Sequence, residues 1–218
     1  MPVDTLTCGG ARYHPRRVFC IGKNYSEHIR ELREEAPGEP VVFMKPATAL
    51  VPPGETLVRP THGGELHHEA ELVVLIGGEG HRLSVKQAPP LIAGLSLGLD
   101  LTLRDLQHSL KSRGLPWERS KAFDQSAPLG DFTPCSPALD PDAIRFECRV
   151  NGQVKQQGDT RHMLYPVAEL IAWLSVPWRL MPGDLVFTGT PSGAGPLPPR
   201  ARVTLDSPQL GCWEWFIE

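Results

Sequence analysis

Glu69 and Glu71 stand two residues apart at the start of an apolar, strand-like run in the stretch ELHHEAELVV, residues 65–74. Side chains i and i+2 of a strand share one face, about 7 Å apart by the rise of the strand. Left unpaired and partly buried, two such carboxylates raise each other's pKa. A divalent cation removes that cost and uses the same geometry, so the pair predicts a metal site.

Asp100 is the natural third ligand of this site. It ends an apolar run directly before a helix-like segment, where an acidic side chain has no packing reason to be. Three carboxylates without a cysteine describe a site for a hard cation, which we expect to be Mg²⁺, with Mn²⁺ or Ca²⁺ as alternatives. Taken alone, two glutamates on a strand are more often a solvated face, so the pair needs support from the rest of the chain.

His67 and His68 raise zinc as another cation. They form HHEAE rather than the H-E-x-x-H pattern of a zinc helix, and they lie on a predicted strand. We therefore expect one of these histidines to be structural or to stand beside the ligands, with carboxylate oxygens holding the cation.

Many short strands must position these side chains. Asn151-Gly152 between alternating runs is typical of a type I′ hairpin. Further strand-like runs occupy residues 17–22, 41–46, 55–60, 70–77, 91–102, 183–191, 201–207 and 211–218.

Three helices are predicted. The first covers residues 24–36, with Asn24 as a plausible N-cap and only three apolar positions, Ile29, Leu32 and Ala36. So narrow an apolar stripe buries little, and we expect this helix to be loosely held. The other two helices cover residues 102–114, with Thr102 near the cap, and 165–175, with Pro166 at the first helical position.

The irregular order of strands and helices predicts a strand-rich α+β fold, a mixed β-roll or barrel-like domain. At 218 residues, with 40% hydrophobic and 22% charged residues, the chain is expected to form a single catalytic domain over 1–218, with a short N-terminal segment 1–16. A net charge of −3 argues against nucleic acid and anionic membranes as partners.

Neither a membrane span nor a secretory signal is visible, since no apolar run approaches the roughly 20 residues that a span needs. The five cysteines are widely spaced and form no C-x-x-C pair. We therefore expect a cytoplasmic, reducing compartment with incidental thiols.

Six blocks in order carry a resemblance to a known family. They are GKNYSEHIRE (22–31), FMKPATA (43–49), HHEAELVVLIG (67–77), GLDLTLRDLQ (98–107), GLPWERSKAFD (114–124) and FTGTPSGAGP (187–196). Together they resemble the fumarylacetoacetate hydrolase family, and within it the short branch that includes acylpyruvases and oxaloacetate decarboxylases. The resemblance covers about residues 17–206 and is specific for the family, but much less so for the substrate.

The resemblance implies a role for each matching residue. Glu69, Glu71 and Asp100 would hold Mg²⁺, and Lys121 would be the cation beside the metal. His28 and Glu31 would form a catalytic pair on a lid that closes over the substrate. The substrate contacts would be Lys45, Arg104, Gln107 and, at the pocket rim, Thr190.

Elementary geometry is compatible with these roles but leaves alternatives open. His28 and Glu31 are neighbours at i and i+3 of a helix, as are Arg104 and Gln107. A carboxylate beside an imidazole orients it as a base for water. The first pair could also be a solvated helix pair, and Lys45 an ordinary surface cation.

The implied activity is Mg²⁺-dependent cleavage next to a carbonyl in a small 2,4-diketo or oxo-dicarboxylic acid. Because the His28–Glu31 pair is intact, we favour acylpyruvate-type C–C hydrolysis, for which fumarylpyruvate is one substrate type. Oxaloacetate decarboxylation comes second and keto–enol isomerisation third. A metal-binding β-domain without turnover is the alternative outside enzymes.

Two further expectations concern the C-terminus and assembly. The ending DSPQLGCWEWFIE departs from the glycine-rich ending associated with the family. The family resemblance implies a homodimer, and the aromatic stretch CWEWFI offers apolar surface that one domain alone would not bury.

Overall fold

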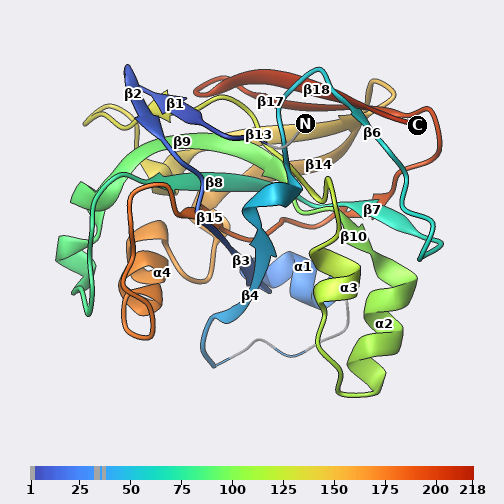
Figure 1. Ribbon diagram of the computed structural model, residues 1–218, viewed down its shortest axis with the longest axis horizontal. Coiled ribbons are helices and arrows are strands. Elements are labelled where there is room, and N and C mark those ends of the chain that lie inside the picture. Colours follow the sequence, from blue (N-terminus) through green and yellow to red (C-terminus); the bar gives the residue numbers. More distant parts are fainter. Residues whose placement is uncertain (1–2, 32–34, 36–37) are drawn as a thin grey trace.

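Two β-sheets face each other across a shared core in the computed structural model of the protein, which describes residues 3–31, 35 and 38–218 (Figure 1). The six-stranded sheet has the order β12–β9–β8–β15–β3–β4, with bounds Thr133–Pro134, Ile92–Leu99, Ala70–Ile76, Leu185–Phe187, Arg17–Gly22 and Val41–Pro46. The five-stranded sheet has the order β14–β13–β17–β18–β6, with bounds Gln153–Asp159, Arg145–Val150, Arg202–Ser207, Gly211–Ile217 and Thr56–Leu57.

Shorter pairings and helices surround these sheets. The small sheets are β10–β7–β16 (Thr102–Leu103, Leu66–His68, Gly195–Pro196), β11–β5 (Ala127–Pro128, Leu50–Val51) and β1–β2 (Leu6–Cys8, Ala11–Tyr13). The α-helices are α1 Ser26–Glu31, α2 Arg104–Ser112, α3 Glu118–Lys121 and α4 Val167–Leu174. Short 3₁₀ helices cover Ala47–Ala49, Val85–Gln87, Pro89–Leu91, Pro141–Ala143 and Thr160–His162. The fold is thus strand-rich α+β as predicted, and the pairings among the described residues form open sheets, so no closed barrel is needed.

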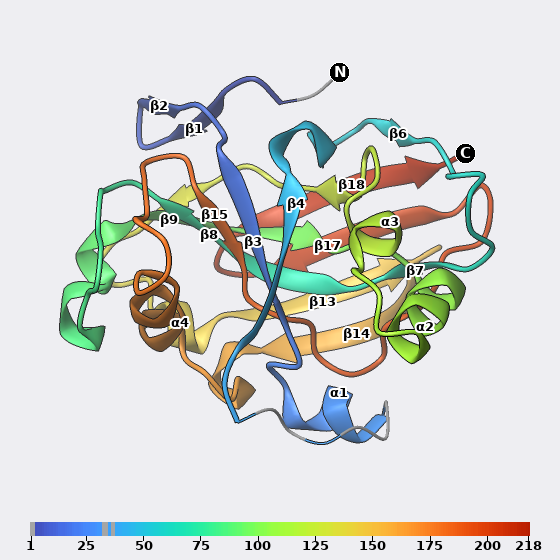
Figure 2. The same ribbon diagram turned by 60° about the horizontal axis from the view of Figure 1, so that its bottom comes forward.

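The central strands of the six-stranded sheet, β9, β8, β15 and β3, are largely buried on both faces. Along β8 every residue is buried. Leu72 and Val74 belong to the core shared with the five-stranded sheet, whereas Val73 and Leu75 belong to a second core on the opposite face. Helix α4 covers one end of the assembly, and α2 and α3 lie side by side at the other (Figure 2).

The predicted helices shift at their starts. The described part of the first is α1, Ser26–Glu31, and the expected apolar positions Leu32 and Ala36 lie outside the described residues. The N-cap prediction for Asn24 was wrong, because its side chain pairs with Tyr165 and Thr188 backbone groups instead. The second helix begins at Arg104, since Thr102 belongs to β10 and pairs with β7.

The third helix begins one residue later than predicted, at Val167, so that Pro166 occupies the cap position. The predicted hairpin is confirmed. Asn151 and Gly152 both have positive φ, 51° and 80°, as a type I′ turn requires. No helix in the described ranges is long and apolar enough to cross a lipid bilayer.

The C-terminal strand β18 is an internal strand of the five-stranded sheet, between β17 and β6. Trp215 and Ile217 are buried, and the Trp215 indole Nε1 donates a hydrogen bond to the Pro52 carbonyl at 2.8 Å. The single domain therefore buries Trp215 and Ile217 by itself, contrary to the expectation for CWEWFI. Phe216 is the only large apolar residue of this stretch that stays exposed.

Candidate active site

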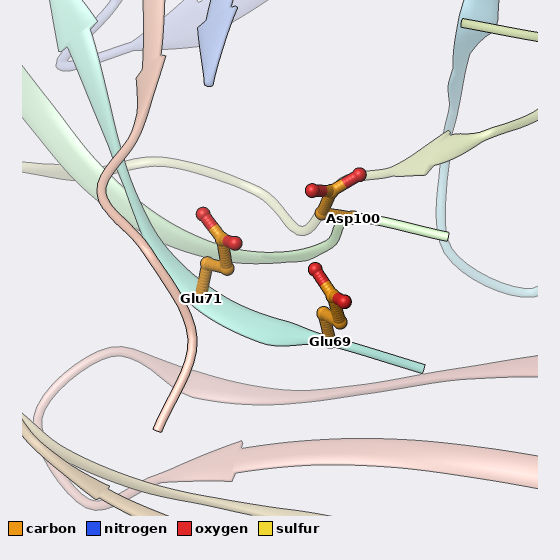
Figure 3. A group of neighbouring side chains, drawn as sticks. All are labelled: Glu69, Glu71 and Asp100. Carbon is orange, nitrogen blue, oxygen red and sulfur yellow. The ribbon is translucent and has the colours of Figure 1, made fainter. Parts of the chain in front are cut away.

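Three buried carboxylates meet where β8 begins and β9 ends (Figure 3). The antiparallel register pairs Ala70 with Leu99, so Glu69 directly precedes one strand and Asp100 directly follows the other. A backbone hydrogen bond from Asp100 N to Glu69 O, 2.8 Å long, joins these two residues. One oxygen from each of Glu69, Glu71 and Asp100 lies within 4.8 Å of the other two.

The donor set fits a hard divalent cation. All three carboxylates are buried, and such oxygens are what Mg²⁺, Mn²⁺ and Ca²⁺ prefer. The buried Oδ1 of Asp100 receives no hydrogen bond from the described residues. Burial, with the neighbouring charges of Asp100 and Glu69, raises the pKa of Glu71 well above its ordinary value. A cation between these groups would satisfy the open oxygen and offset the repulsion.

Three basic side chains surround the carboxylates. The Lys121 ammonium donates hydrogen bonds to Glu69 Oε2 at 2.7 Å and Asp100 Oδ2 at 2.5 Å. Lys45 Nζ lies 2.8 Å from Asp100 Oδ1, at an angle that makes no hydrogen bond, and donates to the Leu101 carbonyl. The Arg104 guanidinium pairs with Glu69 Oε1.

These contacts set the charge state of the cluster. Burial alone would raise the pKa of Glu69, but Lys121 and Arg104 outweigh it and hold that pKa far below its ordinary value. Burial would likewise lower the pKa of Lys121, yet Asp100 and Glu69 raise it. Both side chains therefore stay ionised at neutral pH, which places a fixed cation beside the candidate metal position.

The loop after β15 supports Glu71 from the other side. Gly189 N donates a hydrogen bond to Glu71 Oε2 at 2.8 Å. Gly189 has a φ of +102°, and a Cβ there would lie 2.6 Å from the Asn24 Cβ and 3.2 Å from the Ile21 carbonyl oxygen. Only glycine therefore brings this amide close enough to the carboxylate.

We expect Gly189→Ala to destabilise the protein by more than the roughly 1–2 kcal/mol strain of a left-handed alanine, because the methyl group also displaces the Asn24 segment. Gly152→Ala is the matched control, since Gly152 has a φ of +80° but nothing within 4 Å of its Cβ position. Urea unfolding of both variants measures the difference. Equal losses would contradict the steric part of this account.

His28 and Glu31 occupy one face of α1. His28 Nδ1 lies 3.2 Å from Glu31 Oε2, and the carboxylate also accepts the Gly193 amide at 3.1 Å. The His28 side chain is 6% exposed and lines the same pocket as the three carboxylates. Since Glu31 holds Nδ1, the other ring nitrogen, Nε2, is the one available to a bound molecule.

The remaining wall of the pocket combines polar and apolar groups. Arg104 Nη1 donates to Gln107 Oε1 at 2.6 Å, so one turn of α2 presents both side chains. Phe43 and Trp117 form an apolar side, with ring centroids 6.0 Å apart. The pocket lining comprises Ile21, Gly22, Lys23, His28, Val41, Phe43, Glu69, Glu71, Asp100, Arg104, Gln107, Lys111, Trp117, Lys121 and Thr190.

A family model, described as the fumarylacetoacetate hydrolase C-terminal domain, matches residues 17–214. The chain belongs to the fumarylacetoacetate hydrolase family. Its fold, with two sheets and few short helices, is the one found in solved structures of this family.

Named relatives of this fumarylacetoacetate hydrolase family protein act on small oxo acids. Oxaloacetate tautomerase YcgM of Escherichia coli K12 is 43% identical over 88% of this chain and 89% of its own. Mouse mitochondrial oxaloacetate tautomerase FAHD1 is 40% identical over 84% of this chain and 82% of its own. The crystal structure of fumarylpyruvate hydrolase from Pseudomonas aeruginosa, in complex with Mn²⁺ and pyruvate, has a TM-score of 0.93 at 39% identity and covers 99% of this chain and 95% of its own.

The structure brings the ten residues expected from the family resemblance into one place. Eight line the pocket: His28, Glu69, Glu71, Asp100, Arg104, Gln107, Lys121 and Thr190. Lys45 and Glu31 lie behind it, in contact with Asp100 and His28 respectively. Lys45 is 2% exposed, which removes the alternative of an ordinary surface cation.

Sequence reasoning missed Gln156, which lies behind the pocket wall. Its side chain contacts His68, Ala70 and Thr190. His68 belongs to this network, and burial lowers its pKa. His67 lies on the opposite side of the strand, near Glu65. Burial and the charge of Arg104 lower the pKa of His67 to about 4. Neither histidine is grouped with the three carboxylates, so ligation by oxygen alone stays the prediction.

Proposed function

We propose that the protein is a divalent-metal-dependent enzyme that forms the enol of a small 2-oxo dicarboxylic acid, with keto–enol tautomerisation of oxaloacetate as its reaction. The charge of the cluster carries this proposal. Lys45, Lys121 and Arg104 pair with Asp100 and Glu69, and their three positive charges would balance the three carboxylates of the site once all of them are ionised. A bound divalent cation would leave two positive charges at the centre of the pocket, which suits a dianion.

The relatives support the choice of substrate. A protein named oxaloacetate tautomerase is 43% identical to this chain over 88% of this chain and 89% of its own. We also propose that residues 1–218 act as one catalytic domain.

The residues of the pocket have separate tasks in this reaction. A divalent cation held by Glu69, Glu71 and Asp100, most simply Mg²⁺ or Mn²⁺, would supply a Lewis acid for the 2-oxo and carboxylate oxygens. Arg104, whose guanidinium is kept in place by Gln107, binds the carboxylate at the far end of the substrate. Lys121 stabilises negative charge that develops on the 2-oxo oxygen.

His28 moves the proton. Its Nε2 takes a proton from C3 of the substrate and delivers it to the 2-oxo oxygen, which completes the enol and returns His28 to its starting form. Glu31 at Nδ1 orients the ring and stabilises its charged form. The apolar side formed by Phe43 and Trp117 excludes water from the carbon that exchanges the proton. The segment that carries His28 is still predicted to close over the bound substrate.

Hydrolysis of a C–C bond in an acylpyruvate is the second candidate. A fumarylpyruvate hydrolase, 39% identical, has nearly the same fold, and the His28–Glu31 contact is suited to activate a water molecule. Sequence reasoning placed hydrolysis first. The tautomerase relatives move it to second place, and decarboxylation of oxaloacetate becomes the third reaction that the site could host.

A substrate panel tests this proposal. Loss of enol absorbance from oxaloacetate, pyruvate release from fumarylpyruvate, and CO₂ release from oxaloacetate are measured with Mg²⁺, with Mn²⁺ and with excess chelator. Metal-only blanks correct for the reaction of the free ion. Full activity in chelator would exclude the metal, and no turnover in any of the three assays would leave only a metal-binding domain.

We expect dicarboxylates to be preferred over monocarboxylates of the same type. The second carboxylate adds a charge-assisted contact, so kcat/KM should be at least about tenfold higher for fumarylpyruvate than for acetylpyruvate. The ratio should fall as salt screens the pocket. Equal values for the two substrates at low salt would contradict the charge argument.

We also expect a homodimer, as the family resemblance implies. Sedimentation velocity at micromolar concentration measures this. A monomer under these conditions would count against it.

A further inference from the structure

Gln156 is a buried polar side chain that belongs to neither the ligands nor the pocket lining. It lies on β14, in the five-stranded sheet, and is 1% exposed. A register shift in the β13–β14 pairing sets Gln156, rather than Lys155, opposite the buried Cys148. Its side chain therefore points between the two sheets, toward the segment that carries Glu69 and Glu71.

The amide of Gln156 uses all four of its hydrogen-bonding positions. Oε1 accepts from Ala70 N at 3.0 Å and from His68 Nδ1 at 2.9 Å. Nε2 donates to Thr190 Oγ1 at 2.7 Å and to the Pro191 carbonyl at 2.9 Å. Because a backbone N–H can only donate and a carbonyl can only accept, Ala70 and Pro191 fix which end of the amide is oxygen.

The first consequence concerns the metal position. Ala70 stands between Glu69 and Glu71, so its peptide orientation determines where both carboxylates point. Gln156 holds this peptide from outside the six-stranded sheet, through the amide nitrogen.

The second consequence concerns the polarity of the pocket wall. Thr190 donates its hydroxyl hydrogen to the Ala70 carbonyl at 2.9 Å, and one of its lone pairs receives the Gln156 amide. A hydroxyl has one hydrogen and two lone pairs. The second lone pair of Thr190 Oγ1 therefore remains for the pocket, and Thr190 can only accept a hydrogen bond from a bound molecule.

We propose that Gln156 is a positioning residue of the metal site, one that holds the Ala70 peptide between two metal ligands and sets Thr190 as an acceptor toward the enol hydroxyl of the substrate. This rests on the proposed function, because it presumes a divalent cation at the three carboxylates. Gln156 acts through Ala70 and Thr190 and does not itself line the pocket.

Binding of Mn²⁺ alone tests this role without turnover. Mn²⁺ is titrated into the unaltered protein and into the variants Gln156→Met, Gln156→Glu and Gln157→Met. Electron paramagnetic resonance measures the free Mn²⁺ at each step. Met has a similar length but no hydrogen bonds, whereas Glu keeps the acceptor for Ala70 and His68. Gln157 is the exposed neighbour on the same strand and serves as the matched control.

We expect Gln156→Met to raise the Mn²⁺ dissociation constant about 10–100-fold, the usual effect of removing a group that orients a metal ligand. Gln156→Glu should stay within about threefold of the unaltered protein, since the acceptor that holds the Ala70 peptide is retained. Gln157→Met should bind as the unaltered protein does. Thermal unfolding confirms that each variant is folded at the titration temperature.

Unchanged Mn²⁺ binding by Gln156→Met would overturn the role of Gln156 and leave the proposed function standing. Equal weakening in Gln156→Met and Gln156→Glu would also overturn it, since that result describes a residue needed only for packing. Absence of Mn²⁺ binding by the unaltered protein would overturn the proposed function and this role together.

Gln156→Met removes one hydrogen bond from each of four groups and could fail to fold. Gln156→Ser is the second variant, because its hydroxyl and an accompanying water can pair with part of these groups. It should weaken Mn²⁺ binding at least about fivefold. Binding equal to that of the unaltered protein would overturn the proposal in the same way.

Discussion

Replacing Asp100 by asparagine should abolish turnover and remove tight Mn²⁺ binding. Asp100 is buried beside Glu69, and its Oδ1 has no hydrogen-bond donor among the described residues. The asparagine keeps the shape of the side chain but removes one of three negative charges, which a hard cation needs. It also leaves Lys121 and Lys45 with one carboxylate fewer between them.

Two controls separate this loss from general damage. Glu65→Gln neutralises an exposed carboxylate four residues before Glu69 and should retain full activity. Glu71→Gln should behave like Asp100→Asn, because both carboxylates belong to the same cluster. Titration with Mn²⁺ and steady-state rates with oxaloacetate measure both properties. An Asp100→Asn protein that keeps its activity would refute the metal site.

Replacing His28 by alanine should lower kcat for tautomerisation by roughly 10²–10⁴-fold, the usual contribution of a positioned general base. The effect on fumarylpyruvate hydrolysis should be of the same order, since the same ring nitrogen would activate water. Decarboxylation of oxaloacetate should suffer far less, because loss of CO₂ needs the charge of the metal site and Lys121 but no proton acceptor. Glu31→Gln should lose less than His28→Ala, as Glu31 only orients the ring.

Helix α1 offers a matched control in Glu27→Gln. Glu27 is an exposed neighbour of His28 whose contact is a 3.5 Å hydrogen bond from Ser192, and its replacement should leave all three rates unchanged. All three reactions are measured for each variant at saturating Mg²⁺. Tautomerisation and hydrolysis that both survive in His28→Ala would refute the role of the His28–Glu31 pair.

The carboxylate cluster could be predicted because its signals are local. Glu69 and Glu71 stand at i and i+2, and Asp100 interrupts an apolar run where nothing but function explains an acid. The β8–β9 register then places Asp100 against Glu69, a pairing that a sequence suggests only once both strands are known to be neighbours.

Gln156 could not be found in this way. Counting back from the Asn151-Gly152 turn sets Lys155 opposite Cys148, and a strand with a polar residue at nearly every position gives no sign of a buried face. The bulge turns Gln156 inward at a place where a distant segment comes close: a Cβ at Gly193 would lie 2.2 Å from the Lys155 carbonyl oxygen.

The predicted starts of the first two helices were wrong for a related reason. Asn24 has the local signature of an N-cap, but backbone groups of Tyr165 and Thr188 compete successfully for its side chain. Thr102 is followed by residues that favour a helix, yet it pairs with β7 as part of strand β10. Tertiary hydrogen bonds overrode local preference at both positions.

The order of strands in the two sheets also governs how the molecule can be made on the ribosome. β8 and β9 are neighbours along the chain and in space, so the carboxylate-bearing hairpin can form early in synthesis. β15 and β18 come late in the chain, yet each takes an interior place, β15 between β8 and β3 and β18 between β17 and β6. Until β15 and β18 have been synthesised, the edges of β3 and β6 that they will occupy stay unpaired. Pairing strands that lie so far apart in the sequence is slow, because a long loop must close. The nascent chain thus carries all three candidate metal ligands, Glu69, Glu71 and Asp100, through a long interval in which unpaired strand edges favour aggregation.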